Sequence, residues 1–316
     1  MGKVYAIGEM LIDFTPYGEE GVFKRNAGGA PANVAVCVAR LGGKSAVVTK
    51  LGKDLFGDYL VGVLQRENVD ASYVYRTDCA NTALAFVTLG EGGERSFSFY
   101  RNPSADLFLQ EEEAEAIPFA KDDILHFGSV DLVDYPVRQA HKKAIARAKA
   151  AGAIVSFDPN LRYNLWKDPQ ELLSTVNTFV PYADIVKVSE EELADITGIA
   201  EEKQAVQKLF RGDVRLVFVT RGGNGASVYT KDGKEFTAPS DRANCVDTTG
   251  AGDAFVGAIL YQLQKSGKSR DQLDQSQDLK RWLHFANKAA WFVVQRPGAI
   301  PAMPSETEVF GDHSAD

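Results

Sequence analysis

The segment Asp247-Thr248-Thr249-Gly250-Ala251-Gly252-Asp253 leads into a stretch, 251 to 264, in which apolar residues recur at helical spacing. Its glycines therefore fall where a loop enters a helix. The first N–H groups of a helix have no acceptor within the helix, and the helix dipole favours negative charge there. Gly250 and Gly252 have no Cβ to keep a ligand away from the backbone. The segment predicts a phosphate site, with the carboxylate of Asp253 beside it and able to accept a proton.

Composition and charge exclude several classes of protein. The 316 residues suffice for one large α/β domain or two small ones. The formal net charge of −8 argues against nucleic acid as the main partner, because binding to a phosphate backbone relies on clustered Lys and Arg. No apolar run approaches the roughly 18 residues of a membrane span, and the first nine residues predict a strand and not a signal peptide. The three cysteines show no CxxC spacing, so we expect a cytoplasmic protein without disulfides or zinc.

From residue 124 onward, short apolar segments alternate with helix-compatible ones. Such alternation predicts a parallel sheet with helices on both faces, whose ligands gather at the carboxyl ends of the strands. The expected strands are 124–127, 154–158, 185–188 and 215–220, and the expected helices are 136–151, 169–180, 190–197 and 202–210.

The segment from 72 to 106 differs from the rest, because its expected strands, 72–75, 83–89 and 95–100, have no helices between them. Together with residues 11–27, we interpret it as a small β-lid on a single domain that spans residues 1–316. Its aromatic residues Phe97, Phe99 and Tyr100 exceed what a solvated hairpin needs. They predict a lid that closes over a substrate or pairs with a second subunit.

Two motifs resemble signatures of one family. Residues 247–253 match the anion-hole signature D-T-[TN]-G-A-G-D of the ribokinase-like (PfkB) sugar kinases at every position, and residues 28–33 resemble its G-G-x-x-x-N signature. The resemblance implies a three-layer α/β/α fold with a mostly parallel sheet. It also implies that Asp253 is the catalytic base, and that the amides of Gly250, Ala251, Gly252 and Asp253 hold the transferring phosphoryl group.

The resemblance extends to the binding residues. It implies substrate contacts from Asp13, Gly28, Gly29, Asn33, Arg101, Asn160 and Arg162. It implies ATP contacts from Lys187, Glu192, Thr220, Gly222, Gly225 and Asn287. Glu192 would orient the water shell of Mg²⁺, although Ser189 stands where the family has Asn. The segment 296–304 resembles the family's monovalent-cation loop, and Asp247, Thr249 and Gly298 would be the residues beside a K⁺ ion.

The segment 99–106 resembles bacterial and plant fructokinases more than ribokinases. This resemblance implies transfer of the γ-phosphate of ATP to the 6-hydroxyl of fructose. One alternative is a 2-keto-3-deoxygluconate kinase, in which Arg101 and Arg162 would supply a cation for the substrate carboxylate. A nucleoside kinase and a non-catalytic sensor of sugar or nucleotide are further alternatives, and the presence of Asp253 counts against the sensor. Relatives pack two lids together, so we also expect a homodimer through the lid.

Overall fold

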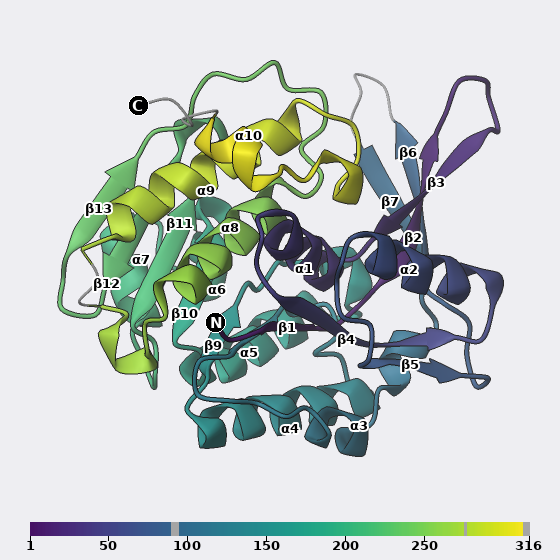
Figure 1. Ribbon diagram of the computed structural model, residues 1–316, viewed down its shortest axis with the longest axis horizontal. Helices are drawn as coiled ribbons and strands as arrows, with labels where there is room; N and C mark the ends of the chain where they lie inside the picture. Colours follow the sequence, from purple (N-terminus) through teal and green to yellow (C-terminus); the bar gives the residue numbers. More distant parts are fainter. Residues whose placement is uncertain (90–94, 275–276, 312–316) are drawn as a thin grey trace.

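The computed structural model describes residues 1–89, 95–274 and 277–311, and its centre is a sheet of nine strands (Figure 1). Neighbouring strands run parallel from β11 to β5, whereas β12 pairs antiparallel with both β11 and β13. From one edge to the other, the strands are β13 (Glu235–Ala238), β12 (Ala226–Thr230), β11 (Leu216–Thr220), β10 (Ile185–Ser189), β9 (Ile154–Phe157), β8 (Ile124–Phe127), β1 (Val4–Ile7), β4 (Ser45–Gly52) and β5 (Val74–Thr77).

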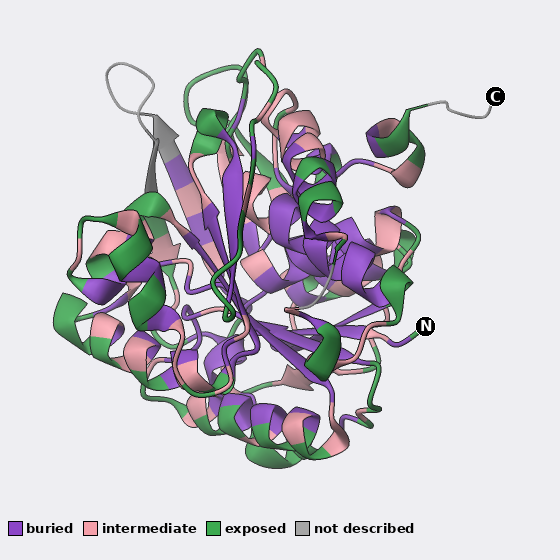
Figure 2. Ribbon diagram, turned by 90° about the vertical axis from the view of Figure 1, so that its left-hand side faces the viewer, coloured by how far each residue is buried: buried purple, intermediate pink, exposed green. Residues whose placement is uncertain are grey.

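Helices cover both faces of this sheet, because its strands are apolar on both sides (Figure 2). In β1, Val4 and Ala6 belong to one buried cluster, and Tyr5 and Ile7 belong to the other. The first cluster includes side chains from α1 (Ala30–Arg40), α2 (Leu55–Arg66), α8 (Ala251–Ser266), α9 (Leu279–Val294) and the short α10 (Glu306–Phe310). The second includes side chains from the short α3 (Glu111–Glu115), α4 (Pro136–Ala151), α5 (Pro169–Phe179), α6 (Glu190–Thr197) and α7 (Glu202–Leu209). The three-layer fold that the resemblance implied is therefore confirmed.

A second sheet of four strands projects from the main body (Figure 1). Its order is β3 (Phe23–Gly28), β2 (Leu11–Pro16), β6 (Leu84–Leu89) and β7 (Arg95–Tyr100). Aromatic rings hold one face together, since Phe86 stacks on Phe14 at 4.8 Å and meets Phe23 and Tyr100 edge-on at 5.5 and 5.4 Å. The side chain of Phe97 lies outside the described part of the chain. We call this sheet the lid.

One expectation about the strands was wrong, and one strand was not expected. The predicted lid strand at 72–75 is instead β5, which pairs in parallel with β4 at the edge of the main sheet. Helix α2 separates β4 from β5, and a helical crossover is what places two strands in parallel. A strand and turn region was expected at 236–246, where β13 begins, but its hairpin partner β12 was not expected, although Asp232-Gly233 lies between the two strands. Among the described helices, none is both long and apolar enough to cross a membrane.

Candidate active site

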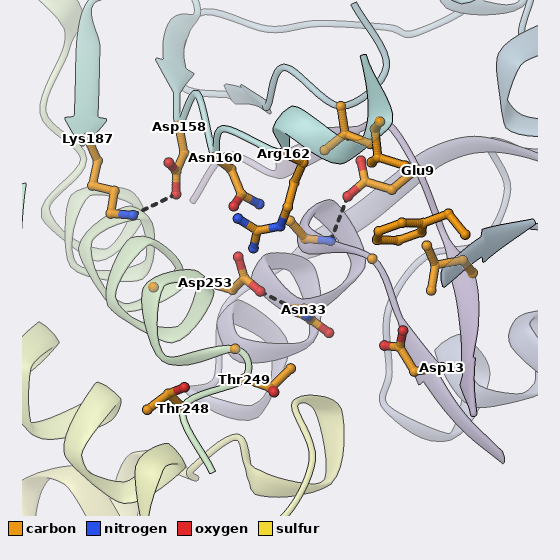
Figure 3. Close-up of a pocket in the computed structure, with 18 residues that line it drawn as sticks. Glu9, Asp13, Asn33, Asp158, Asn160, Arg162, Lys187, Thr248, Thr249 and Asp253 are labelled. Atoms are coloured by element: carbon orange, nitrogen blue, oxygen red, sulfur yellow. Dashed lines mark hydrogen bonds and ion pairs between the residues drawn. The ribbon is translucent and has the colours of Figure 1, made fainter. Parts of the chain in front are cut away.

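The carboxyl ends of neighbouring strands bring polar side chains to one edge of the sheet (Figure 3). Glu9 follows β1, while Asp158, Asn160 and Arg162 follow β9. Lys187 lies within β10, two residues before that strand ends. They line a cavity of about 310 Å³, and the amino end of α8 lines another part of it.

Asp253 lies in the first turn of α8, as the sequence predicted. Gly250 precedes the helix with a φ of 82°, a left-handed conformation that favours glycine. The side-chain amide of Asn33, on α1, donates a hydrogen bond of 2.8 Å to Oδ2 of Asp253. Burial raises the pKa of Asp253 to about 6, against the lowering effect of this hydrogen bond. The carboxylate is therefore largely ionised at neutral pH and able to accept a proton.

Asp13 lies at the lid end of the cavity, on β2 (Figure 3). Burial, together with the charges of Asp247 and Asp253, raises its pKa to about 7. Gly28 packs behind it, since a Cβ there would lie 2.0 Å from Oδ2 of Asp13. Gly29 lines the cavity with a φ of 109°, and its Cβ would meet the carbonyl oxygen of Glu9 at 2.4 Å. Because both residues are glycine, the chain can pass from β3 into α1 close to the wall of the cavity.

Two further cavities adjoin the first. One, of about 520 Å³, is lined by the predicted residues Thr220, Gly222, Gly225, Ala251 and Asn287, together with Cys245 and Trp291. The other, of about 430 Å³, is lined by Lys187, Glu192, Thr220, Glu191 and Asp195. Gly252 lines all three cavities, and Thr248 lines the first two. The three spaces therefore meet at the start of α8.

Sequence reasoning did not assign a role in the site to Asp158. Its Oδ2 pairs with Nζ of Lys187 at 3.1 Å, and its buried Oδ1 has no hydrogen-bond partner among the described residues. Asp158 does not cap a helix, because the next helical turn starts at Tyr163. The pairing joins the ends of β9 and β10, and it holds the ammonium group of Lys187 beside the cavity.

Glu192 has a structural role in addition to any contact with a ligand. Its two carboxylate oxygens accept hydrogen bonds from the backbone N–H groups of Leu161 and Ser189, at 2.7 and 2.9 Å. The hydroxyl of Ser189 accepts from the N–H of Glu192, which completes a capping box. The signature of this capping box, S-x-x-E at residues 189–192, could have predicted the arrangement from the sequence. Glu192 thereby fixes the loop that carries Asn160 and Arg162.

Four predicted residues do not line these cavities. Gly28 packs behind Asp13, and Arg101 is buried between the carboxylates of Asp106 and Asp131. Arg101 thus lies outside the cavity walls, with its Nε and Nη2 groups donating to acids within the protein, and its contact with the substrate stays a prediction. The carboxylate of Asp247 accepts hydrogen bonds of 2.9 Å from the backbone N–H groups of Thr249 and Gly298, and it so ties two loops together. Thr249 itself lines the first cavity.

Asn287, on α9, lines the second cavity. Its amide nitrogen donates to the carbonyl groups of Ala238 and Pro239, at 2.9 and 3.1 Å. It thus holds the start of the loop after β13, which includes Ser240 and Asp241 in the wall of the same cavity.

Comparison with known proteins agrees with this geometry. The profile of the pfkB family carbohydrate kinases matches residues 1–306. The chain belongs to this family. Among relatives of the family, it is 44% identical over 313 residues to fructokinase-1 of Oryza sativa subsp. japonica, a match that covers 97% of this chain and 96% of the other.

Solved structures of relatives share the fold. A fructokinase from Xylella fastidiosa with bound ATP is 37% identical with a TM-score of 0.90, covering 98% of this chain and 97% of that chain. A fructokinase from Vibrio cholerae O395, with fructose, ADP and calcium bound, is 38% identical with a TM-score of 0.89 and 98% coverage of each chain. An aminoimidazole riboside kinase from Salmonella enterica is 30% identical with a TM-score of 0.88, covering 99% of this chain and 100% of that chain. These structural relatives thus differ in their sugar-containing ligands.

Proposed function

We propose that this pfkB family member is a fructokinase, which transfers the γ-phosphoryl group of ATP to the 6-hydroxyl of fructose. The observation that carries the proposal is the meeting of three cavities at Gly252, with Asp253 lining the first of them. A sugar in the first cavity and a nucleotide across the second and third would present their reacting atoms to each other at this point. The 41–44% identity to plant fructokinases over nearly the whole chain supports fructose as the sugar.

In the proposed reaction, Asp253 accepts the proton of the sugar hydroxyl as that oxygen attacks the γ-phosphorus. A bond forms between the sugar oxygen and phosphorus, the bond from phosphorus to the β,γ-bridging oxygen breaks, and ADP leaves with that electron pair. The amides at the start of α8 and the ammonium group of Lys187 would stabilise negative charge on the transferring group. Lys187 is suitably placed, because a Cβ on Gly252 would lie 3.2 Å from its Nζ.

The sugar would occupy the first cavity, beneath the lid strands. Asn33 is well suited to contact a hydroxyl group, since its Nδ2 donates to Asp253 while its buried Oδ1 has no partner among the described residues. Asp13 and Asn160 line the same cavity and can accept or donate hydrogen bonds to further hydroxyls. Gly28 would act indirectly, by leaving room for the carboxylate of Asp13.

ATP would lie with its base in the second cavity, between Gly222 and Gly225 on one side and α9 on the other. Mg²⁺ prefers oxygen ligands and retains several waters, so it would enter with the phosphates into the third cavity beside Glu192. Bound there, the ion would neutralise charge on the phosphate oxygens. A monovalent cation such as K⁺ would lie near the loops that Asp247 joins, at Thr249 and Gly298.

A coupled assay of ADP formation with fructose, 2-keto-3-deoxygluconate, ribose and adenosine tests the proposal. We expect the highest kcat/KM with fructose. Replacing Asp253 with Asn removes the base but keeps the hydrogen-bonding shape, so kcat should fall by roughly 10²–10⁴-fold while ATP still binds. Turnover close to that of the wild type in this variant would contradict the role of Asp253, and preference for another of the four substrates would contradict the role of fructose.

A further inference from the structure

A buried ion cluster lies at the base of the lid, outside the lining of the first cavity. Arg101 directly follows β7 and donates hydrogen bonds to the carboxylates of Asp106 and Asp131, and the bond from its Nε to Asp106 is 3.1 Å long. The side chains of Arg101, Asp106 and Asp131 are only 6%, 1% and 1% exposed. Because water does not reach these groups to replace a lost partner, each contact is costly to break.

Both acids of the cluster belong to the main body of the protein. Asp106 lies in the helical turn Ala105–Phe108, whose last carbonyl group accepts a hydrogen bond of 2.9 Å from Nζ of Lys50, on β4. Asp131 lies in the loop between β8 and α4. Arg101 therefore joins the end of the last lid strand to two segments of the main body.

The cluster is next in sequence to two residues of the cavity wall. Phe99 lies on β7, two residues before Arg101, and Val130 directly precedes Asp131. Both Phe99 and Val130 line the first cavity, in which the sugar would lie. Strand β7 is at the edge of the lid and pairs with β6 alone among the described strands. The bond from Arg101 to Asp131 thus links the strand that carries Phe99 to the loop that carries Val130.

We propose that Arg101 is a positioning residue, which sets the distance between Phe99 and Val130 by binding Asp131 and so fits the cavity to the sugar. The inference rests on the proposed function for the place of the sugar in the first cavity. Neither Phe99 nor Val130 lines the second or the third cavity, where the nucleotide would lie. Loosening the cluster should therefore weaken the binding of the sugar and leave the binding of ATP unchanged.

The variant Asp131→Asn tests this proposal, because Asn keeps the shape but removes the charge that strengthens the bond to Arg101. We expect the KM for the sugar to rise about fivefold or more, and the KM for ATP to stay within about twofold of the wild-type value. A direct contact between Arg101 and the sugar predicts a different result, since Asp131→Asn would free a donor for the ligand and leave the sugar KM unchanged or lower. Asp106→Asn should act in the same direction as Asp131→Asn, and it decides the question if the first variant does not fold.

A matched control is Asp184→Asn, which changes another buried carboxylate that an arginine, Arg270, binds. Asp184 directly precedes β10 and so lies at the opposite edge of the sheet from the cavities. This variant should lower the Tm without changing the KM for the sugar. A rise in the sugar KM equal to that of Asp131→Asn would show that loss of stability alone is the cause and would contradict the proposal.

A double-mutant cycle tests whether Asp131 acts through its neighbour Val130. In a Val130→Ala background, Asp131→Asn should raise the sugar KM by less than about twofold, because the contact that it positions is already lost. The same fold increase in both backgrounds would refute this link. Parallel increases in the KM for sugar and for ATP would indicate a merely structural role, and an unchanged sugar KM in the folded cluster variants would also overturn the proposal.

These measurements use whichever sugar gives the highest kcat/KM, so they remain separate from the proposed function. Preference for another sugar would refute fructose but leave the role of Arg101 to be decided by the KM values. An unchanged sugar KM in Asp131→Asn and Asp106→Asn of an active fructokinase would refute the positioning role alone.

Discussion

Replacing Asn33 with Ala should shift the pH dependence of the reaction, because its amide is the hydrogen-bond donor that favours the ionised form of Asp253. The pKa of Asp253 is about 6 with this donor present. A hydrogen bond to a charged group contributes about 1.5 kcal/mol, which corresponds to about one pKa unit, so the pKa in the variant should be about 7. Only the ionised carboxylate accepts a proton, so the loss must grow as the pH falls.

The size of the effect follows from these two pKa values. At pH 6, about half of Asp253 is ionised in the wild type, against about a tenth in the variant, a roughly fivefold loss. Above pH 8, both carboxylates are almost fully ionised and the loss from this cause disappears. A lost contact between Asn33 and the sugar would instead lower activity by the same factor at every pH.

The assay is kcat/KM for fructose at saturating ATP, from ADP formation in quenched samples between pH 5.5 and 8.5. The ratio of variant to wild type at each pH is the decisive quantity, since the titration of Asp13, whose pKa is raised to about 7, cancels from it. A ratio that stays constant over this range would refute the idea that Asn33 sets the pKa of the base.

Three further predictions concern the phosphate site, the sugar site and the lid. Gly252→Ala should fold normally, because its Cβ would meet only the flexible end of Lys187 at 3.2 Å. The variant should bind ATP more weakly, because the same Cβ crowds the proposed phosphate site, and unchanged ATP affinity would place the phosphate elsewhere. The control Gly250→Ala should lower the Tm, since a φ of 82° and a Cβ 2.8 Å from that of Ala299 disfavour any side chain. Asp13→Asn should raise the KM for the sugar much more than that for ATP, and equal effects would remove Asp13 from the sugar site. The exposed aromatic residues Tyr17, Phe23 and Tyr100 of the lid segments predict a homodimer through the lid, which a monomeric mass in analytical ultracentrifugation of active enzyme would contradict.

Local patterns in the sequence were enough to predict most of the main sheet and its helices. The expected helices at 136–151 and 190–197 match α4 and α6 at both ends. Proline begins α4 and glycine follows each of these helices, so their boundaries depend on neighbouring residues alone. The strand at 72–75 was assigned to the wrong sheet because an edge strand of four residues carries no local sign of its partner.

The sequence by itself was enough to predict a phosphate site, because a glycine-rich loop that enters a helix creates free N–H groups wherever the chain runs next. Only the tertiary structure decided which charges meet. Asn33 and Asp253 are 220 residues apart and share a hydrogen bond, and Lys187 pairs with Asp158 from a neighbouring strand. Arg101 was expected to face the substrate, yet it is neutralised by Asp106 and Asp131. The state of a buried charge depends on its partners and its distance from water, and packing between distant segments sets both.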